Sequence, residues 1–266
     1  MAWTPPPQPT ALNTPVEDVL FLDIETVPSY PSIDNLPSEG MKVFLKKFTN
    51  ETAQHLKDNQ PVTKEIIDAF YEHLWQTKAA LFCEYNKIVC VSLGVMPPGR
   101  EGTFRVKAIF GEDEREIIKA LTPTLGKAKF LCAHNGKGFD FPMLARKYIQ
   151  YGLDIPSIIS VWGLKPWETK LFDTMEMWGM NVFNDRVSLD ALAFLFGLPS
   201  PKKEISGGTV GAVYYSSPDD DALPWEYEDR LKKIAEYCNG DVVTLANVYL
   251  RMINKPPIIE GKIVSV

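Results

Sequence analysis

The sequence predicts an α/β fold with a mixed sheet, and two observations lead to this expectation. First, three apolar runs with strand character lie in the first half of the chain, and a turn-rich segment joins the second to the third. Second, the later part alternates segments of helical periodicity with short apolar runs, the order typical of βαβ crossovers. The first observation favours an antiparallel meander, and the second adds parallel strands.

The chain begins with a segment, residues 1–15, that is rich in Pro, Thr and Ala. It has neither the positively charged start nor the apolar run of a secretory signal, so we expect a flexible lead-in. No stretch approaches the roughly 18 consecutive apolar residues of a membrane span. The sequence therefore predicts a soluble, cytoplasmic protein that has no membrane partner.

The first predicted strand runs from Val19 to Asp23, a continuous apolar run that ends in a carboxylate and suits a strand buried on both faces. A long segment, residues 28–86, separates it from the second predicted strand. Apolar residues recur at helical spacing in that segment: Ile66, Ile67, Phe70, Leu74 and Leu81. We expect a helical insertion there.

The remaining elements follow from the same two periodicities. We expect strands at residues 87–96, 103–110, 129–134 and 171–173. We expect helices at residues 113–121, 141–151 and 188–196, and a long helical region at residues 225–252. Ser188 is the predicted N-cap of its helix, because a serine side chain can accept a hydrogen bond from the first helical turn.

The length of the chain favours one main domain. At 266 residues and 45% hydrophobic composition, the chain can bury one large core, and no extended polar stretch divides it. We therefore expect a single domain over residues 16–255 that carries the helical insertion at residues 28–86. Residues 256–266 are expected to form a C-terminal tail.

Charge and cysteine content narrow the classes of function. A formal net charge of -6 argues against a protein that holds nucleic acid by positive charge over a wide surface. It does not exclude an enzyme that grips the end of a strand, because carboxylates that bind metal count as negative in this sum. The four cysteines have no CxxC spacing, so neither a zinc site nor a disulfide framework is indicated.

Two carboxylates, Asp23 and Glu25, stand two residues apart at the end of the first predicted strand. If the strand continues through Glu25, both side chains project from the same face. Two anions in one small space are costly to desolvate unless a cation compensates them, and clusters of carboxylate oxygens suit Mg²⁺ or Mn²⁺. Taken alone, the pair could equally be solvated or cap the following loop.

A second polar group, residues 133–140 (AHNGKGFD), joins a predicted strand to a predicted helix through two glycines. Asp140 lies where a carboxylate could face the first pair, and it could also cap the helix that follows. Asn135 could hydrogen-bond a substrate or the local backbone, and the glycines could let a strand terminus approach closely. We expect His134 to be structural.

A third group lies in the long helical region near the C-terminus. Tyr237 and Asp241 are four residues apart, so a helix places them on one face and could bring a phenol and a carboxylate into one site. In the alternative, Tyr237 packs in the core, and Asp241, directly after Gly240, caps a second helical segment that begins at Val242.

Together, the three groups resemble the three exonuclease motifs of the DEDD superfamily. These are Asp-x-Glu after an apolar strand, Asn-x-x-x-Phe-Asp at a strand-to-helix turn and Tyr-x-x-x-Asp in a terminal helix, in that order. The tyrosine is typical of the DEDDy branch, which includes the proofreading domains of family B DNA polymerases. The resemblance runs from about Val19 to Arg251 and is to a stand-alone relative of those domains. It implies a ribonuclease H-like sheet of five strands, three antiparallel and two parallel, flanked by helices.

The resemblance implies a metal-dependent 3′-5′ exonuclease that hydrolyses the terminal phosphodiesters of single-stranded nucleic acid, DNA more readily than RNA, to nucleoside 5′-monophosphates. By this resemblance, two divalent ions, Mg²⁺ or Mn²⁺, would lie about 4 Å apart. One would generate the nucleophilic hydroxide, and the other would stabilise the leaving 3′ oxygen. The ligands would be four carboxylates: Asp23, Glu25, Asp140 and Asp241. Tyr237 would orient the attacking water or help to deprotonate it. Because a free phenol has a pKa near about 10, its position matters more than its basicity.

Candidates for substrate contact lie near the first and second motifs. Asn135 could hydrogen-bond the terminal nucleotides, and Phe139 could stack on them or wedge between them. Phe139 could equally pack in the core. Thr26 and Lys137 are further candidates for substrate binding. Two lysines at residues 202–203 are candidate phosphate contacts.

A phosphatase is the alternative enzyme class. Asp23-Ile24-Glu25-Thr26 is close to the Asp-x-Asp-x-Thr nucleophile motif of haloacid-dehalogenase-like phosphatases, and Gly240-Asp241 resembles their late Gly-Asp motif. Those enzymes carry Asp where Glu25 stands, and this alternative leaves the second motif and the tyrosine unused. A covalent aspartyl-phosphate on Asp23 would favour it.

The last alternative is a nucleic-acid-binding module that has the fold but no activity. The presence of all four carboxylates and the tyrosine argues against it, although a fold alone never settles function. Tight binding of a 3′ end without hydrolysis in Mg²⁺ or Mn²⁺ would support it.

Overall fold

The computed structural model describes residues 10–58, 63–100, 102–180, 182, 186–199, 205–217 and 226–266. The chain forms two compact units. We call the first the sheet unit: Met1–Glu25, Val89–Ile205 and Leu231–Val266. We call the second the insertion unit: Thr26–Ile88 and Ser206–Arg230. The division into a lead-in at residues 1–15, one exonuclease domain over residues 16–255 and a tail stays a prediction.

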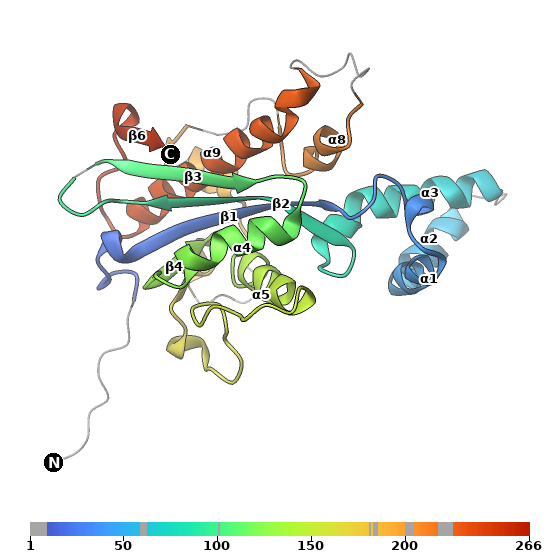
Figure 1. Ribbon diagram of the computed structural model, residues 1–266, viewed down its shortest axis with the longest axis horizontal. Coiled ribbons are helices and arrows are strands. Elements are labelled where there is room, and N and C mark those ends of the chain that lie inside the picture. Colours follow the sequence, from blue (N-terminus) through green and yellow to red (C-terminus); the bar gives the residue numbers. More distant parts are fainter. Residues whose placement is uncertain are drawn as a thin grey trace. The chain divides into compact units, whose positions relative to one another are not determined.

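The sheet mixes parallel and antiparallel strands in the order β5-β4-β1-β2-β3-β6. Figure 1 labels these strands except β5. The described strands are β1 (Val19–Pro28), β2 (Asn86–Val95), β3 (Phe104–Phe110), β4 (Phe130–Ala133), β5 (Leu171–Asp173) and β6 (Ile263–Ser265). β2 and β3 are antiparallel, whereas β4 is parallel to β1 and β5 is parallel to β4. This arrangement confirms the predicted fold class, and five of these strands lie where the sequence indicated them.

The strand β6 was not foreseen. It pairs in parallel with β3, where Phe104 is opposite Ile263, although residues 256–266 were expected to be a tail. The same segment is also tied to the core, because the backbone N–H of Ile258 donates to Asn247 Oδ1 at 2.8 Å and the Ile258 side chain is 8% exposed. A strand of three residues is too short to show a periodicity of its own.

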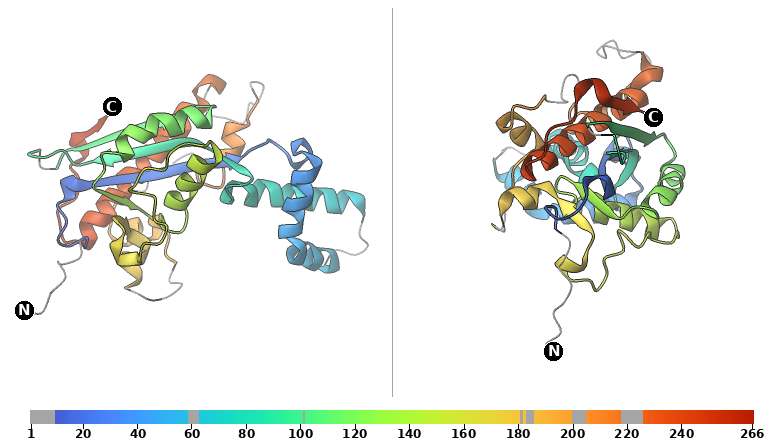
Figure 2. Two further views of the ribbon diagram at one scale, coloured as in Figure 1. Left: turned by 60° about the horizontal axis from the view of Figure 1, so that its bottom comes forward. Right: turned by 90° about the vertical axis from the view of Figure 1, so that its left-hand side faces the viewer.

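Helices cover both faces of the sheet. The described helices of this unit are α4 (Glu114–Leu125), α5 (Asp140–Gln150), α6 (Thr174–Gly179), α7 (Leu189–Leu195) and α9 (Arg230–Met252), the last of which starts one residue before the unit. In Figure 2, α9 lies on one face of the sheet, and α4 and α5 lie on the other. The predicted cap of α7 is confirmed, because Ser188 Oγ accepts a hydrogen bond from the backbone N–H of Ala191 at 3.1 Å.

The helix α9 packs onto the sheet through a core of apolar side chains. Core members include Val19 and Phe21 of β1, Phe104 of β3, and Val242, Leu245 and Tyr249 of α9. The rings of Phe21 and Tyr249 meet edge to face at 5.3 Å between centroids. Because α9 continues without a break through Gly240, the alternative in which Asp241 caps a second helical segment is wrong.

The insertion unit is helical, as the sequence predicts. Its described helices are α1 (Ser38–Lys47), α2 (Thr49–Asp58), α3 (Lys64–Lys78) and α8 (Val210–Tyr214). Phe44 lies at the centre of an aromatic cluster, with ring centroids 5.1 Å from Trp75 and 4.9 Å from Tyr85. Leu74 joins this core, but Leu81 is 53% exposed because it lies in a 3-10 turn beyond the end of α3.

None of the described helices combines the length and the apolar character that crossing a membrane requires.

Candidate active site

The strand β1 directs Asp23 and Glu25 toward α9. Val19 and Phe21, the preceding residues of the same parity, pack in the core against α9. Alternate residues of a strand share a face, so the continuation of β1 through Pro28 places Asp23 and Glu25 on the α9 face. Glu25 is 7% exposed and Asp23 is half-buried.

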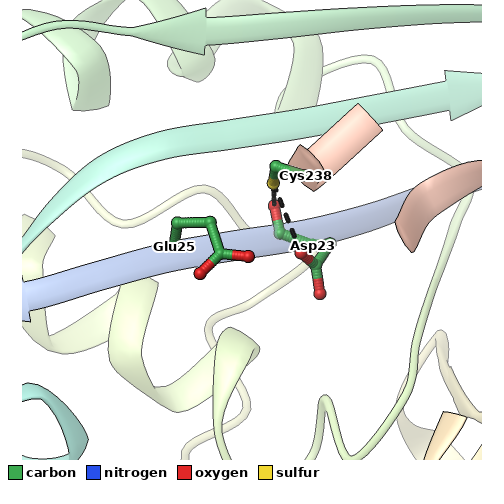
Figure 3. A group of neighbouring side chains, drawn as sticks. All are labelled: Asp23, Glu25 and Cys238. Carbon is green, nitrogen blue, oxygen red and sulfur yellow. Dashed lines mark hydrogen bonds between the residues drawn. The ribbon is translucent and has the colours of Figure 1, made fainter. Parts of the chain in front are cut away.

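The helix α9 brings three polar side chains to this pair. Tyr237 and Asp241 lie four residues apart on one helix face, and the phenol hydrogen-bonds the Asp241 carboxylate. The Cys238 thiol donates to Asp23, at 3.3 Å to Oδ2 and 3.5 Å to the main-chain oxygen (Figure 3). Carboxylate oxygens of Asp23 and Glu25 and the Cys238 sulfur all lie within 4.8 Å of one another.

Asp140 reaches the same region from the first residue of α5. β4 pairs with β1 up to Phe21 and Cys132, so the backbone N–H of Ile24 lies beyond the end of that pairing. This N–H donates to Asp140 Oδ1 at 3.2 Å. Because β4 ends early, the N–H of Ile24 is free of the pairing with β4 and can bond a carboxylate from α5. Asp140 is 4% exposed, and its charge acts on Asp23.

The turn before α5 is held by Asp173, at the end of β5. The Asp173 carboxylate accepts hydrogen bonds from the backbone N–H groups of Asn135 at 2.9 Å and Lys137 at 3.0 Å. Gly136 is required between them, because a Cβ there would lie 2.4 Å from the Ala133 Cβ. Asp173 was not among the predicted site residues, although it carries the same signal as Asp23, an acid at the end of a strand.

His134 is part of the framework. Its Nδ1 lies 2.9 Å from Thr174 Oγ1, and its Nε2 lies 2.8 Å from the main-chain oxygen of Val187. Burial lowers the pKa of His134, so its ring is neutral near pH 7. With both nitrogens engaged, the ring supports the structural role expected of it.

The carboxylates share a desolvated space in which their charges repel. Burial raises the pKa of Asp23 well above its ordinary value, and the charges of Glu25, Asp140 and Asp241 raise it further. Burial also raises the pKa of Asp140 to about 7, although the N–H of Ile24 opposes this. Buried carboxylates of this kind fit a hard divalent cation, which would offset their repulsion.

Tyr237 has a similar environment. Burial raises the pKa of its phenol far above the ordinary value, and the neighbouring charges of Asp241 and Glu25 add to the effect. The hydroxyl therefore keeps its proton at neutral pH.

The expected substrate contacts on the second motif differ in exposure. Asn135 is exposed and Phe139 is half-buried, both within the turn that leads to Asp140. Asn135 has a positive φ of 59°, which asparagine tolerates better than most residues. Lys137 Nζ forms an ion pair with Glu176 at 2.6 Å. The substrate roles of these residues stay predictions.

Two further expectations concern residues elsewhere. Thr26 belongs to the insertion unit, where its hydroxyl donates to the main-chain oxygen of Ala80 at 2.8 Å. Its substrate role also stays a prediction. The lysines at residues 202–203 lie outside the described residues.

Cys238 is the neighbour of the carboxylates that sequence analysis did not foresee. The spacing of the cysteines indicates neither a zinc site nor a disulfide framework, so it does not point to Cys238. The available signal was position within the helix, since Cys238 follows Tyr237 and stands three residues before Asp241.

Comparison with known protein families gives one match. A family described as predicted 3′-5′ exonucleases related to the exonuclease domain of PolB matches residues 78–260, well over half of the chain. The matched range contains Asp140, Tyr237 and Asp241 and begins after Asp23 and Glu25. No curated protein matches the chain.

Among solved structures, the chain is similar to the family B DNA polymerase from the hyperthermophilic archaeon Pyrobaculum calidifontis, with 15% sequence identity and a TM-score of 0.43. The similarity covers 96% of this chain and 28% of the polymerase, so this chain spans a minor part of that protein. The family match covers far more than half of the sequence. The chain therefore belongs to the family of predicted 3′-5′ exonucleases related to the exonuclease domain of PolB.

Proposed function

We propose that this protein is a metal-dependent 3′-5′ exonuclease that acts on single-stranded nucleic acid, DNA more readily than RNA, and releases nucleoside 5′-monophosphates. The observation that carries the proposal is the convergence of carboxylates from three separate elements. Asp23 and Glu25 come from β1, Asp140 from α5 and Asp241 from α9, and the charges of the other three all act on Asp23. Membership of the family supports the same activity.

The four carboxylates are the proposed metal ligands. When bound, two divalent ions, Mg²⁺ or Mn²⁺, supply the positive charge that activates a nucleophile and stabilises the leaving 3′ oxygen. The carboxylates compensate that charge and orient the scissile phosphate by fixing where the cations lie. The raised pKa values of Asp23 and Asp140 support this role, because a cation would favour their ionised forms.

Tyr237 is proposed to orient the attacking water. Because its pKa is raised, the phenol is a hydrogen-bond donor and is not a base at neutral pH. The hydrogen bond to Asp241 fixes its direction within the site.

The turn before α5 is proposed to hold the terminal nucleotides. Asn135 is exposed and can hydrogen-bond a nucleotide, and Phe139 can stack on a base.

Hydrolysis of labelled single strands tests the proposal. Purified protein is incubated with 5′-labelled single-stranded DNA or RNA in Mg²⁺, in Mn²⁺ and in chelator. We expect stepwise shortening from the 3′ end, release of nucleoside 5′-monophosphates, no cleavage in chelator, and faster cleavage of DNA.

Matched variants locate the active site. We expect Asp23→Ala and Asp241→Ala to lower kcat by about 100-fold or more, since each removes a ligand of the catalytic metals. Asp154→Ala is the control, because Asp154 is an exposed acid of the same unit outside the site, and it should retain full activity. Equal cleavage by wild type and both site variants would show that the site assignment is wrong. A phosphate trapped covalently on Asp23 would instead favour the phosphatase, and 3′-end binding without hydrolysis would favour the binding module.

A further inference from the structure

An apolar cavity lies against α5, in the same unit as the carboxylates. Its volume is about 420 Å³, which is within the range of small-ligand pockets. α5 contributes Phe141, Ala145 and Ile149 to the wall, and the segment that follows α5 contributes Ile159, Trp162 and Leu164.

Large apolar side chains at this cavity are exposed to solvent. Trp162 is 75% exposed, Ile149 52% and Leu164 47%. Trp167, next to the lining residue Pro166, is 57% exposed. Single exposed apolar residues are ordinary, whereas a cluster of them around a cavity marks a binding surface.

Cations accompany these aromatic rings. Arg146 lines the cavity and is exposed. Lys165 Nζ lies 5.4 Å from the centroid of the Trp167 ring. Lys137 also lines the cavity and is paired with Glu176. Aromatic faces interspersed with cations are the combination that holds single-stranded nucleic acid, by stacking and phosphate contact.

The cavity is continuous with the turn that carries the second motif. Lys137 belongs to that turn, and Phe141 directly follows Asp140. A helix turns by about 100° per residue, so Phe141, Ala145 and Ile149 are rotated about the axis of α5 by roughly 100° to 180° from Asp140. The cavity therefore lies on a different side of α5 from the Asp140 side chain. A strand whose end lies at the carboxylates would therefore cross the N-terminal end of α5 to reach the cavity.

We propose that this cavity, with Trp162, Trp167 and Arg146 at its edge, binds bases and phosphates of the substrate strand a few nucleotides before its 3′ end. The inference rests on the proposed function, because it needs the strand end to lie at the carboxylates. The occupant is a single strand of nucleic acid, since the exposed cations complement phosphates and the tryptophans offer stacking surfaces.

Trp162→Ala, measured on substrates of two lengths, tests the proposal. For a single strand of about 12 nucleotides, we expect KM and Kd to rise about 5- to 150-fold, the effect of losing one stacked base. For a dinucleotide, which is too short to reach the cavity, we expect unchanged kcat/KM. Trp162→Phe should restore most of the affinity, because phenylalanine also stacks.

Phe194→Ala is the matched control, because Phe194 is 87% exposed in α7 and does not line the cavity. It should bind both substrates like wild type. Arg146→Ala should reduce the slope of log affinity against log salt by about 1 for the longer strand, as expected for one lost phosphate contact.

Unchanged affinity of Trp162→Ala for the longer strand overturns the proposal and leaves the cavity to another ligand, such as an apolar protein segment. Direct binding, followed by fluorescence anisotropy, separates this inference from the proposed function. If wild type binds the longer strand but cleaves nothing, the proposed function fails while weaker binding by Trp162→Ala still supports the cavity. If wild type neither binds nor cleaves, both are overturned.

Discussion

Ionisation of a buried carboxylate in the candidate site lowers the free energy of unfolding, and the size of this effect depends on pH. Burial raises the pKa of Asp140 to about 7 from an ordinary value of 3.8. A group whose pKa is raised by folding contributes stability that is fully present below the unfolded pKa and is lost as the pH rises through the folded pKa. In the metal-free protein, Asp140 therefore favours folding at pH 4 and loses that contribution by pH 8.

We expect the metal-free protein to lose stability between about pH 4 and pH 8, and Asp140→Asn to lack that part of the loss. The difference between the ordinary and the folded pKa of Asp140 limits this loss in the free energy of unfolding to roughly 4 kcal/mol. Urea denaturation in chelator at pH 4 and pH 8 measures this change in the free energy of unfolding. Mg²⁺ or Mn²⁺ should restore stability at pH 8 more in wild type than in Asp140→Asn. Parallel pH profiles for the two proteins would contradict the assignment.

The Cys238 side chain hydrogen-bonds Asp23. Its thiol donates to both the carboxylate and the main-chain oxygen of Asp23. Groups that hydrogen-bond a metal ligand orient it, and their loss weakens metal binding.

We therefore expect Cys238→Ala to raise the Mg²⁺ concentration needed for half-maximal activity by about 10-fold. Cys238→Ser keeps a donor at this position and should stay close to wild type. Metal titrations of the nuclease activity measure the effect, with Cys83→Ala in the insertion unit as the control. Equal metal requirements for the alanine variant and wild type would rule out a positioning role.

At the scale of elements, the approach of α9 to the sheet depends on Gly94 of β2. A Cβ at this position would lie 2.2 Å from a ring carbon of Phe104 and 2.6 Å from a methyl of Val242. A side chain fits there only if Phe104 or Val242 shifts. Val242 belongs to α9, the helix that also carries Tyr237 and Asp241.

Gly94→Ala should lower the free energy of unfolding by about 1–3 kcal/mol, the usual cost of overpacking a core. It should also reduce nuclease activity, because a displaced α9 moves Tyr237 and Asp241 away from β1. Gly111→Ala is the control, since a Cβ there meets nothing within 4 Å. Its change should stay within about 0.5 kcal/mol. Chemical denaturation of both variants measures their free energies of unfolding. Equal values would show that the packing of α9 does not depend on Gly94.

At the scale of the whole molecule, the C-terminal segment belongs to the core of the sheet unit. Ile258 packs in the same apolar core as Phe21 and Tyr249, and β6 extends the sheet beside β3. The neighbouring Ile259 is 51% exposed and offers a matched comparison.

Ile258→Ala should therefore cost about 2–5 kcal/mol of folding stability, and Ile259→Ala less than about 1 kcal/mol. Removal of residues 256–266 should cost at least as much as Ile258→Ala. Thermal and urea unfolding of the three variants measure these effects. A truncated chain as stable as wild type would mean that the segment is dispensable.

Much of the fold could be predicted because its elements are long enough to show a period. β1, β2 and β3 were expected from apolar runs, and α5 and α9 from helical spacing. The short elements α6, α8 and β6 were missed, since three to six residues carry almost no periodic signal. The equally short β5 was expected at residues 171–173. The sequence could predict most of the candidate site, but not Asp173 or Cys238, whose roles depend on partners far away in the chain.

By itself, the sequence determined which side chains share a face. Period two on β1 aligns Asp23 with Glu25, and four-residue spacing on α9 aligns Tyr237 with Asp241. Only the tertiary structure decided which faces meet. The contact of Asp140 with Ile24 spans 116 residues and that of Cys238 with Asp23 spans 215. Such contacts depend on the strand order and on where β4 ends, and a local pattern of residues contains no information about either.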